Sequence, residues 1–279
     1  MKRRAFTAVE LVIVIGVLAA LLAILLPVAR RTRLASGLEA SLSNVRTIMA
    51  ATSAYMIDTG LPPMRGSRYS SGTMSGWDTW CLGGKNSSTY WNTAIGGLFT
   101  ESAYSRPLNA YLDGSRIPRP PGYVNAGSGA NWPGHPGTWT LQTGTPTAAQ
   151  QALQIPVFKS PGDVATRQRN WPNVTPGVTC YDDVGTSYLV NMKWWDQPGI
   201  PTNFTQRYTQ GCERIALPTI SPRYVLVHDQ TGDMVANGIA TVGEFGKQNA
   251  SVCGFIDGRA AYMEMVPGGF SGPGYTLVP

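Results

Sequence analysis

Glu10 is the residue whose chemical type is most unusual for its position. It is an ionisable side chain at the entrance of the run Leu11 to Ala29, which contains no charged residue. At about 1.5 Å per residue in a helix, such a run nearly matches the roughly 30 Å hydrocarbon core of a bilayer. A carboxylate at this boundary is costly unless it is paired, so we predict a functional role for Glu10. The alternative is a solvated carboxylate at a helix start.

The other residues that could do chemistry do not form a catalytic motif. The chain has no G-x-S-x-G or H-E-x-x-H sequence and only two histidines, His135 and His228. His228 precedes Asp229, which makes a His-Asp pair conceivable, but no nucleophile is placed beside it. We therefore expect that the protein is not an enzyme and that it needs no catalytic cofactor.

The cysteines are too widely spaced for a CxxC metal or redox motif. Two interpretations stay open: up to two disulfides that staple long loops outside the cytoplasm, or buried reduced thiols. Three pairings are compatible with the sequence. The four residues are Cys81, Cys180, Cys212 and Cys253.

The net charge of +6 gives no reason to expect a nucleic-acid partner. Three of the 22 basic residues, Lys2, Arg3 and Arg4, precede the apolar run, and the rest nearly balance the 16 acidic residues. A secretory signal peptide would also begin with basic residues and an apolar core. The segment that follows the core here is a poor match to a small-residue cleavage site.

The elements that position Glu10 are a long helix and the body behind it. Beyond Pro27, apolar residues recur at three- and four-residue steps up to Met56, which predicts an amphipathic helix that packs on the body. Gly60 suits the left-handed C-cap, and the prolines after it cannot extend the helix. We expect a transmembrane half at residues 6–29, an amphipathic half at 30–60, and a bend at Pro27.

The remaining residues, 61–279, are rich in Gly, Pro and other turn formers, which predicts a loop-rich globular domain. Short β-favouring runs occur at residues 185–191 and 223–228. The clearest signal is Asp257-Gly258 between two such runs, which is typical of a β-hairpin. The expected fold class is α+β, with the long N-terminal helix packed on a C-terminal antiparallel sheet.

The sequence Ala5-Phe6-Thr7-Ala8-Val9-Glu10-Leu11-Val12-Ile13-Val14-Ile15 resembles the N-terminal signal of type IV pilins and type II secretion pseudopilins. In that family, a prepilin peptidase cuts before the Phe and methylates its new amino group. The resemblance implies that residues 1–5 are a leader and that Phe6 is the first mature residue. Pro27 then matches a helix-kinking proline of the family. The family usually has Gly before the cut, where this chain has Ala5.

Further expectations follow from this resemblance. Glu10 would attract the amino group of Phe6 of a neighbouring subunit inside a filament. The N-terminus would be cytoplasmic, with a single span in the inner membrane and the globular domain in the periplasm. The partners implied are prepilin peptidase, other pilin or pseudopilin subunits, the inner-membrane assembly platform and the membrane itself. The charges on either side of the span give little topological bias of their own.

The body is similar in part to a large pseudopilin-like family common in planctomycete and verrucomicrobial genomes. That family has a Cys-Pro-Ser-Asp element, a Thr-Ser-Tyr element and a terminal His-x9-Asp-Gly element. Here the corresponding segments are Lys159-Ser160-Pro161-Gly162-Asp163, then Thr186-Ser187-Tyr188 with Asn191, and finally Asp257-Gly258 with Asn249. Ser160 stands where that Cys would be, and Lys247 stands where that His would be.

Calcium is a candidate cofactor because some pseudopilins stabilise their C-terminal loops with it, and it requires clustered oxygen ligands. The candidate ligands are Asp229, Asp233 and Asp257, with Glu244 behind them. The chain contains no EF-hand loop. The turn at Gly258 already explains the presence of Asp257.

Two functions are therefore expected as alternatives. The first is a structural subunit, a pseudopilin or minor pilin, of a type II secretion pseudopilus or related type IV filament. The second is a membrane-tethered extracytoplasmic protein that binds carbohydrate by stacking sugars on tryptophans, although burial of those rings in the core would equally explain them. The tryptophans concerned are Trp77, Trp80, Trp91, Trp132, Trp139 and Trp171.

Overall fold

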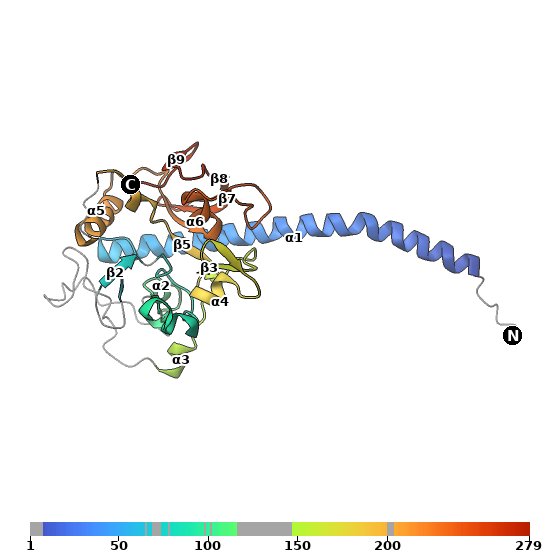
Figure 1. Ribbon diagram of the computed structural model, residues 1–279, viewed down its shortest axis with the longest axis horizontal. Coiled ribbons are helices and arrows are strands. Elements are labelled where there is room, and N and C mark those ends of the chain that lie inside the picture. Colours follow the sequence, from blue (N-terminus) through green and yellow to red (C-terminus); the bar gives the residue numbers. More distant parts are fainter. Residues whose placement is uncertain are drawn as a thin grey trace.

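The structure of the protein is a computed structural model. It describes residues 8–64, 66–68, 74–77, 79–97, 99–100, 102–115, 147–199 and 204–279. Figure 1 shows one long helix, α1, whose first half projects from a globular body and whose second half lies within that body. The arrangement is α+β, as the sequence predicts.

Helix α1 runs from Ala8 to Thr59 without interruption, and Pro27 lies inside it. The helix ends where the sequence predicts: Gly60 has a φ of 74°, and its N–H donates to the carbonyl of Met56 at 2.8 Å. This left-handed glycine satisfies a carbonyl that the helix leaves without an internal partner. The projecting half curves gently (Figure 1), and the helix remains one continuous element through Pro27.

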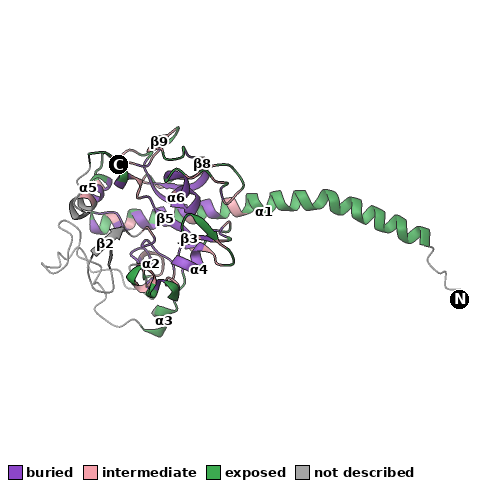
Figure 2. Ribbon diagram, viewed as in Figure 1, coloured by how far each residue is buried: buried purple, intermediate pink, exposed green. Residues whose placement is uncertain are grey.

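The exposed part of α1 extends beyond the end of the apolar run at Ala29. Residues 8–36 are all exposed, and continuous packing on the body begins near Ser41 (Figure 2). The amphipathic half therefore leaves its first two turns outside the body. The helix residues buried in the body are Ser41, Leu42, Val45, Ile48, Met49, Ala51, Thr52, Tyr55 and Thr59.

The main sheet has four strands in the order β5-β6-β7-β8, and every neighbouring pair is antiparallel. Helix α5 connects β5 to β6, and helix α6 connects β6 to β7. These elements are β5 (Tyr188–Val190), α5 (Phe204–Ala216), β6 (Val225–Asp229), α6 (Gln230–Ala236), β7 (Ala250–Phe255) and β8 (Ala260–Glu264). The predicted C-terminal antiparallel sheet is confirmed.

Alternation along β7 separates two packing faces. Val252 packs in one cluster with Val45 and Met49 of α1, whereas Cys253 and Phe255 pack in a second cluster that includes residues of α6. Gly254 allows α1 to approach, because a Cβ there would lie 2.7 Å from Val45 Cγ1. The sheet is therefore covered by α1 on one face and by α6 on the other.

The predicted hairpin at Asp257-Gly258 joins β7 to β8. The N–H of Gly258 donates to Phe255 O, and the N–H of Phe255 donates to Arg259 O, both at 2.9 Å. Gly258 has a φ of 91°. The loop thus has three residues with glycine in the left-handed position, which is the second commonest hairpin form.

Smaller elements complete the body. A lower lobe lies on the other side of α1 from the sheet, as Figure 1 shows. The remaining elements before the main sheet are β1 (Gly66–Arg68), β2 (Met74–Trp77), α2 (Asn109–Leu112), α3 (Ala148–Gln151), β3 (Thr166–Asn170), β4 (Asn173–Thr175) and α4 (Cys180–Val184). Two short strands near the C-terminus, β9 (Ser271–Gly272) and β10 (Tyr275–Thr276), pair with each other. Most of the intervening segments are 3-10 turns and loops, as the Gly and Pro content predicts.

Candidate functional site

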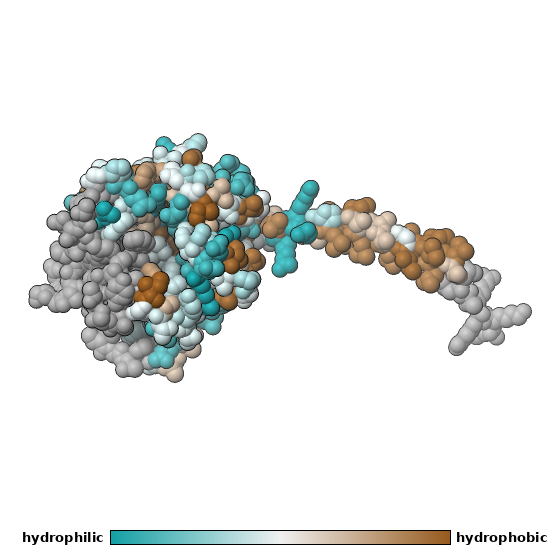
Figure 3. Space-filling model, viewed as in Figure 1, coloured by the Kyte–Doolittle hydropathy of each residue, from teal (hydrophilic) through white to brown (hydrophobic). Residues whose placement is uncertain are grey.

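The projecting half of α1 is an apolar surface with no protein around it. Its large side chains are more than 40% exposed, including Val12 at 68% and Ile24 at 69%. Figure 3 shows an almost continuous hydrophobic surface along this half. A monomeric soluble protein rarely exposes so extended an apolar surface, which marks a contact with lipid or protein. Within the described residues, α1 is the one helix long and apolar enough to cross a membrane.

Glu10 lies in the first turn of α1 and is exposed. A carboxylate at this end is stabilised by the helix dipole, whose N-terminus carries partial positive charge. The predicted cleavage and methylation residues, Ala5 and Phe6, lie outside the described residues. The pairing of Glu10 with the amino group of another subunit stays a prediction.

At the other end of α1, a chain of hydroxyls attaches the helix to the body. Ser41 Oγ lies 2.7 Å from the hydroxyl of Tyr188 and 3.4 Å from Ser160 Oγ. The hydroxyl of Ser160 donates to Glu244 Oε2 at 2.6 Å. Ser41, Ser160 and Tyr188 are buried, and burial also raises the pKa of Glu244 well above its usual range. The Glu244 carboxyl therefore ends this chain.

The two body segments that carry the partial family resemblance meet at this attachment. Asp163 accepts hydrogen bonds from the N–H groups of Cys180 and Tyr181, both at 2.8 Å, and from Ser187 Oγ at 2.6 Å. In addition, Asn44 on α1 donates to the carbonyl of Lys159 at 3.1 Å. The segments 159–163 and 186–188 thus bridge α1 to the sheet. These contacts support a structural role for the two segments, which is to hold α1 to the body.

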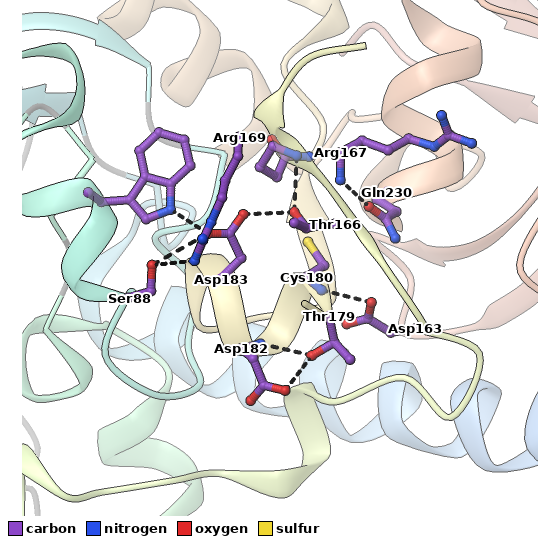
Figure 4. A network of polar contacts seen from close by, with 12 residues as sticks. Ser88, Asp163, Thr166, Arg167, Arg169, Thr179, Cys180, Asp182, Asp183 and Gln230 are labelled. Atoms are coloured by element: carbon purple, nitrogen blue, oxygen red, sulfur yellow. Dashed lines mark hydrogen bonds and ion pairs between the residues drawn. The ribbon is translucent and has the colours of Figure 1, made fainter. Parts of the chain in front are cut away.

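A second carboxylate network lies at α4 (Figure 4). Asp183 is fully buried and accepts from Arg169 Nε at 2.6 Å, Thr166 Oγ1 at 2.8 Å and Trp91 Nε1 at 2.9 Å. Arg169 also donates to Ser88 Oγ at 2.9 Å. The network joins α4, β3 and the segment around residue 90, which are far apart in the sequence. Sequence reasoning did not identify Asp183.

A local signal could have located α4. Thr179 is followed three residues later by Asp182, which is a variant of the capping-box pattern. The N–H of Asp182 donates to Thr179 Oγ1 at 3.0 Å, and that hydroxyl donates back to Asp182 Oδ2 at 2.8 Å. Lys85 lowers the pKa of Asp182 through a 2.5 Å ion pair. The pattern locates the helix, but it does not identify Asp183 as the buried neighbour.

The three predicted calcium ligands are not brought together. Asp229 is buried at the start of α6, where it accepts from Gly232 N at 3.1 Å and Ser251 Oγ at 2.7 Å. Asp257 lies in the exposed hairpin and pairs with Arg259 at 3.1 Å. Among the described residues, no group of three His, Cys, Asp or Glu side chains could hold a metal ion. Asp229 and Asp257 thus serve different local structures, and calcium binding stays a prediction.

His228 and Asp229 are adjacent, but they do not form a catalytic pair. The imidazole Nδ1 lies 2.9 Å from the backbone carbonyl of Asp229, while the Asp229 carboxylate points to Gly232, Ser251 and Val252. Burial lowers the pKa of His228 to about 4, so the ring is neutral. His135 lies outside the described residues.

Asp233 in α6 carries a testable pH dependence. Burial raises its pKa to about 7, well above the usual value of an unfolded chain. Because the folded state binds the proton more tightly, the Asp233 contribution to stability is present below pH 4 and decreases as pH rises towards 7. We expect Asp233→Asn to remove this decrease, measured as urea unfolding of the full chain in detergent at pH 4, 6 and 8. The exposed Asp257→Asn is the control, and equal pH profiles for the two variants would contradict the assignment.

None of the four cysteines forms a disulfide bond in the structure, and all four are buried. Cys81 and Cys212 belong to the main core, Cys253 packs on the α6 side of the sheet, and Cys180 lies in the cluster around Trp80 and Trp91. Of the two interpretations left open by the sequence, the structure has the buried thiols. Each sulfur occupies the core as a small apolar group.

The described tryptophans provide little exposed stacking surface. Trp80 and Trp91 are 4% and 2% exposed, and their rings pack on each other at a centroid distance of 4.7 Å. Trp171 is 40% exposed. Trp132 and Trp139 lie outside the described residues, as does the side chain of Trp77. Core burial, the alternative to sugar stacking, applies to Trp80 and Trp91.

Comparison with known proteins assigns the chain to no family. No family model, curated protein or solved structure matches it. In the structure, the long N-terminal helix exposes an apolar half and packs its other half on a C-terminal antiparallel sheet. This arrangement is pilin-like.

Proposed function

We propose that the protein is a membrane-anchored subunit of an extracytoplasmic filament, a pseudopilin or minor pilin of the type II secretion or type IV pilus kind. The observation that carries the proposal is the division of α1. Its first half is apolar and fully exposed, whereas Val45, Ile48, Met49 and Tyr55 of its second half are completely buried. The same helix is therefore both an anchor and a part of the core.

Such a helix suits two successive environments. In the membrane, lipid covers the apolar half and all its backbone groups are satisfied within the helix. In a filament, the same side chains would pack against the apolar helices of neighbouring subunits. The helix continues without a break into the buried half, so the body is held at a fixed distance from either environment. The polar attachment at Ser41 supports this role.

The proposal includes processing at the N-terminus. Prepilin peptidase would cut between Ala5 and Phe6 and methylate the new amino group of Phe6. The family resemblance would place the leader in the cytoplasm, with the body on the opposite side of the inner membrane. Glu10 would then guide the entry of each subunit by attracting the Phe6 amino group of its neighbour.

Mass spectrometry of the N-terminal peptide tests the proposal directly. We expect the membrane-extracted protein from its own host to begin with N-methylated Phe6. Alanine is small, like the glycine that the family usually has before the cut, so Ala5→Gly should yield the same mature peptide, whereas Ala5→Leu should leave the leader attached. Recovery of wild-type protein that retains Met1 to Ala5 would contradict the processing step.

The alternative, a tethered carbohydrate-binding protein, receives less support. Of the tryptophans considered for sugar stacking, Trp80 and Trp91 belong to the core, and their exposure is too low for a stacking platform. Trp171 is exposed, but its ring makes no paired stacking arrangement with another described aromatic ring. The alternative predicts that substitution of Glu10 leaves localisation and binding unchanged, which distinguishes it from filament assembly.

A further inference from the structure

A groove of about 880 Å³ lies where α1 enters the body. One wall is the exposed part of α1 from Arg30 to Ala40, and the other is formed by loops of the body that include Val164, Val242 and Phe245. Gly37 allows the close approach at its inner end, since a Cβ there would lie 3.3 Å from the ring of Phe245. The groove therefore opens towards the apolar half of the helix.

The helical wall of this groove is strongly basic. Arg30 and Arg33 line it, the neighbouring Arg31 is also exposed, and none of the three forms an ion pair within the described part of the chain. Figure 3 shows a hydrophilic band between the apolar half of α1 and the body. The acidic residues nearby are Glu39, which is exposed on the helix, and Glu244, and the arginines of the region, with Arg167, outnumber them. The net charge of this region is positive.

The body side of the groove is unusually apolar for an exposed surface. Val164 is 79% exposed, Val242 is 59% exposed and Val174 is 43% exposed, and all three line the groove. Arg167 lies among them, and one of its guanidinium nitrogens donates to the carbonyl of Pro172 at 3.1 Å. Figure 3 shows hydrophobic patches on the side of the body nearest the projecting helix. Arginines beside exposed valines are suited to an interface between lipid headgroups and acyl chains.

The position along α1 fits such an interface. The charge-free run ends at Ala29, so in a spanning helix Arg30 lies at the boundary of the hydrocarbon core. The headgroup layer extends roughly 5 to 7 Å beyond that boundary, and Gly37 follows Arg30 by about 10 Å of helix. Modest tilting of the helix would bring the valines to the headgroups. Arginines on the exported side also run against the positive-inside bias, a cost that anionic lipid would offset.

We propose that this groove and its arginines form a docking surface for anionic phospholipid, which holds the body against the membrane before assembly. The proposal rests on the membrane anchor of the proposed function. The basic residues would bind the lipid phosphates, while Val164 and Val242 would enter the interface. Release from the lipid would then accompany extraction of the subunit into the filament.

The test uses the full chain reconstituted at low density in vesicles of phosphatidylcholine, with or without 30% phosphatidylglycerol. A polarity-sensitive fluorophore is attached at Val242→Cys, and the control label is at Leu217→Cys, which is 50% exposed just beyond α5 at the far end of the body (Figure 1). We expect a blue shift of the Val242 label that requires phosphatidylglycerol and is lost at about 1 M salt, where screening is nearly complete. The Leu217 label should not change.

Charge variants make the test quantitative. Each basic residue near an anionic surface contributes a factor of about five, so Arg30→Gln with Arg33→Gln should reduce the ratio of docked to undocked protein roughly 25-fold. Arg46→Gln, on the same helix but away from the groove, should have no effect. An equal shift in both lipid compositions, or no shift in either, would overturn the proposal. A shift that depends on protein density would also overturn it, because it would indicate that a second copy of the protein covers the groove. Extraction of the wild-type chain by alkaline carbonate would instead contradict the membrane anchor.

Discussion

Replacement of Glu10 by Gln should reduce the amount of the protein recovered in extracellular filaments by about tenfold or more, while the protein remains in the membrane. An ion pair at about 4 Å with an effective dielectric constant near 20 is worth about 4 kcal/mol. Loss of even half of that attraction weakens the association of each subunit about 30-fold. The measurement is the ratio of filament to membrane fractions in cells that produce wild-type or variant protein.

Glu39→Gln is the matched control for this experiment. Glu39 lies on the same helix and is exposed, but it is beyond the apolar half. The Glu39→Gln variant should assemble like the wild type. The N-terminal mass of each variant should be measured in the same samples, because a Glu10 variant that is no longer cleaved would fail for another reason. A processed Glu10→Gln protein that assembles at the wild-type level would contradict the proposed pairing with Phe6.

Replacement of Asp183 by Ala should lower the free energy of unfolding by about 3 to 5 kcal/mol, the usual cost of removing one partner from a buried ion pair. Asp183 is fully buried, and its loss would leave Arg169 and the indole N–H of Trp91 without their acceptor. Urea unfolding of the full chain in detergent, followed by tryptophan fluorescence, measures the change. The indole of Trp91 lies within the affected network and should report its loss.

The adjacent residue provides a close control. Asp182 follows the same N-cap and also forms an ion pair, but its side chain is 47% exposed. Asp182→Ala should therefore cost less than about 1 kcal/mol. Adding Arg169→Met to Asp183→Ala should recover part of the lost stability, because the unpaired guanidinium is then removed. Equal losses for the two aspartate variants would show that burial does not determine the effect.

The polar networks around Ser41, Asp163 and Asp183 together connect α1 to the rest of the body. The Ser41 hydroxyl chain holds the helix to the sheet, and Asp163 ties the same loop to the start of α4. Asp183 then ties α4 to the lower lobe. In a filament, any pulling force on the apolar half of α1 would pass to the body through the buried half. Polar contacts with fixed geometry resist sliding of the helix better than apolar packing alone.

Several features of the fold depend on short stretches of sequence and were predictable for that reason. The charge-free run and the three- and four-residue spacing beyond Pro27 were sufficient to predict one long helix that ends at Gly60. The Asp257-Gly258 turn was sufficient to predict the hairpin between β7 and β8. In each case a single residue type meets a local conformational requirement, such as the positive φ of a glycine.

The roles of the polar residues depended instead on tertiary structure. Ser41 and Tyr188 are 147 residues apart, and nothing near either one in the sequence indicates that their hydroxyls meet. Asp182 and Asp183 are adjacent and chemically identical, yet one is exposed and the other buried. Asp229 and Asp257 were grouped as candidate calcium ligands from their residue type and the family resemblance, and the fold gives them different partners. The sequence by itself determined the apolar run, the long helix and the hairpin, because local backbone preference and hydrophobic periodicity suffice there. Only the tertiary structure decided which carboxylates are buried and what they hold, because burial depends on contacts between distant segments.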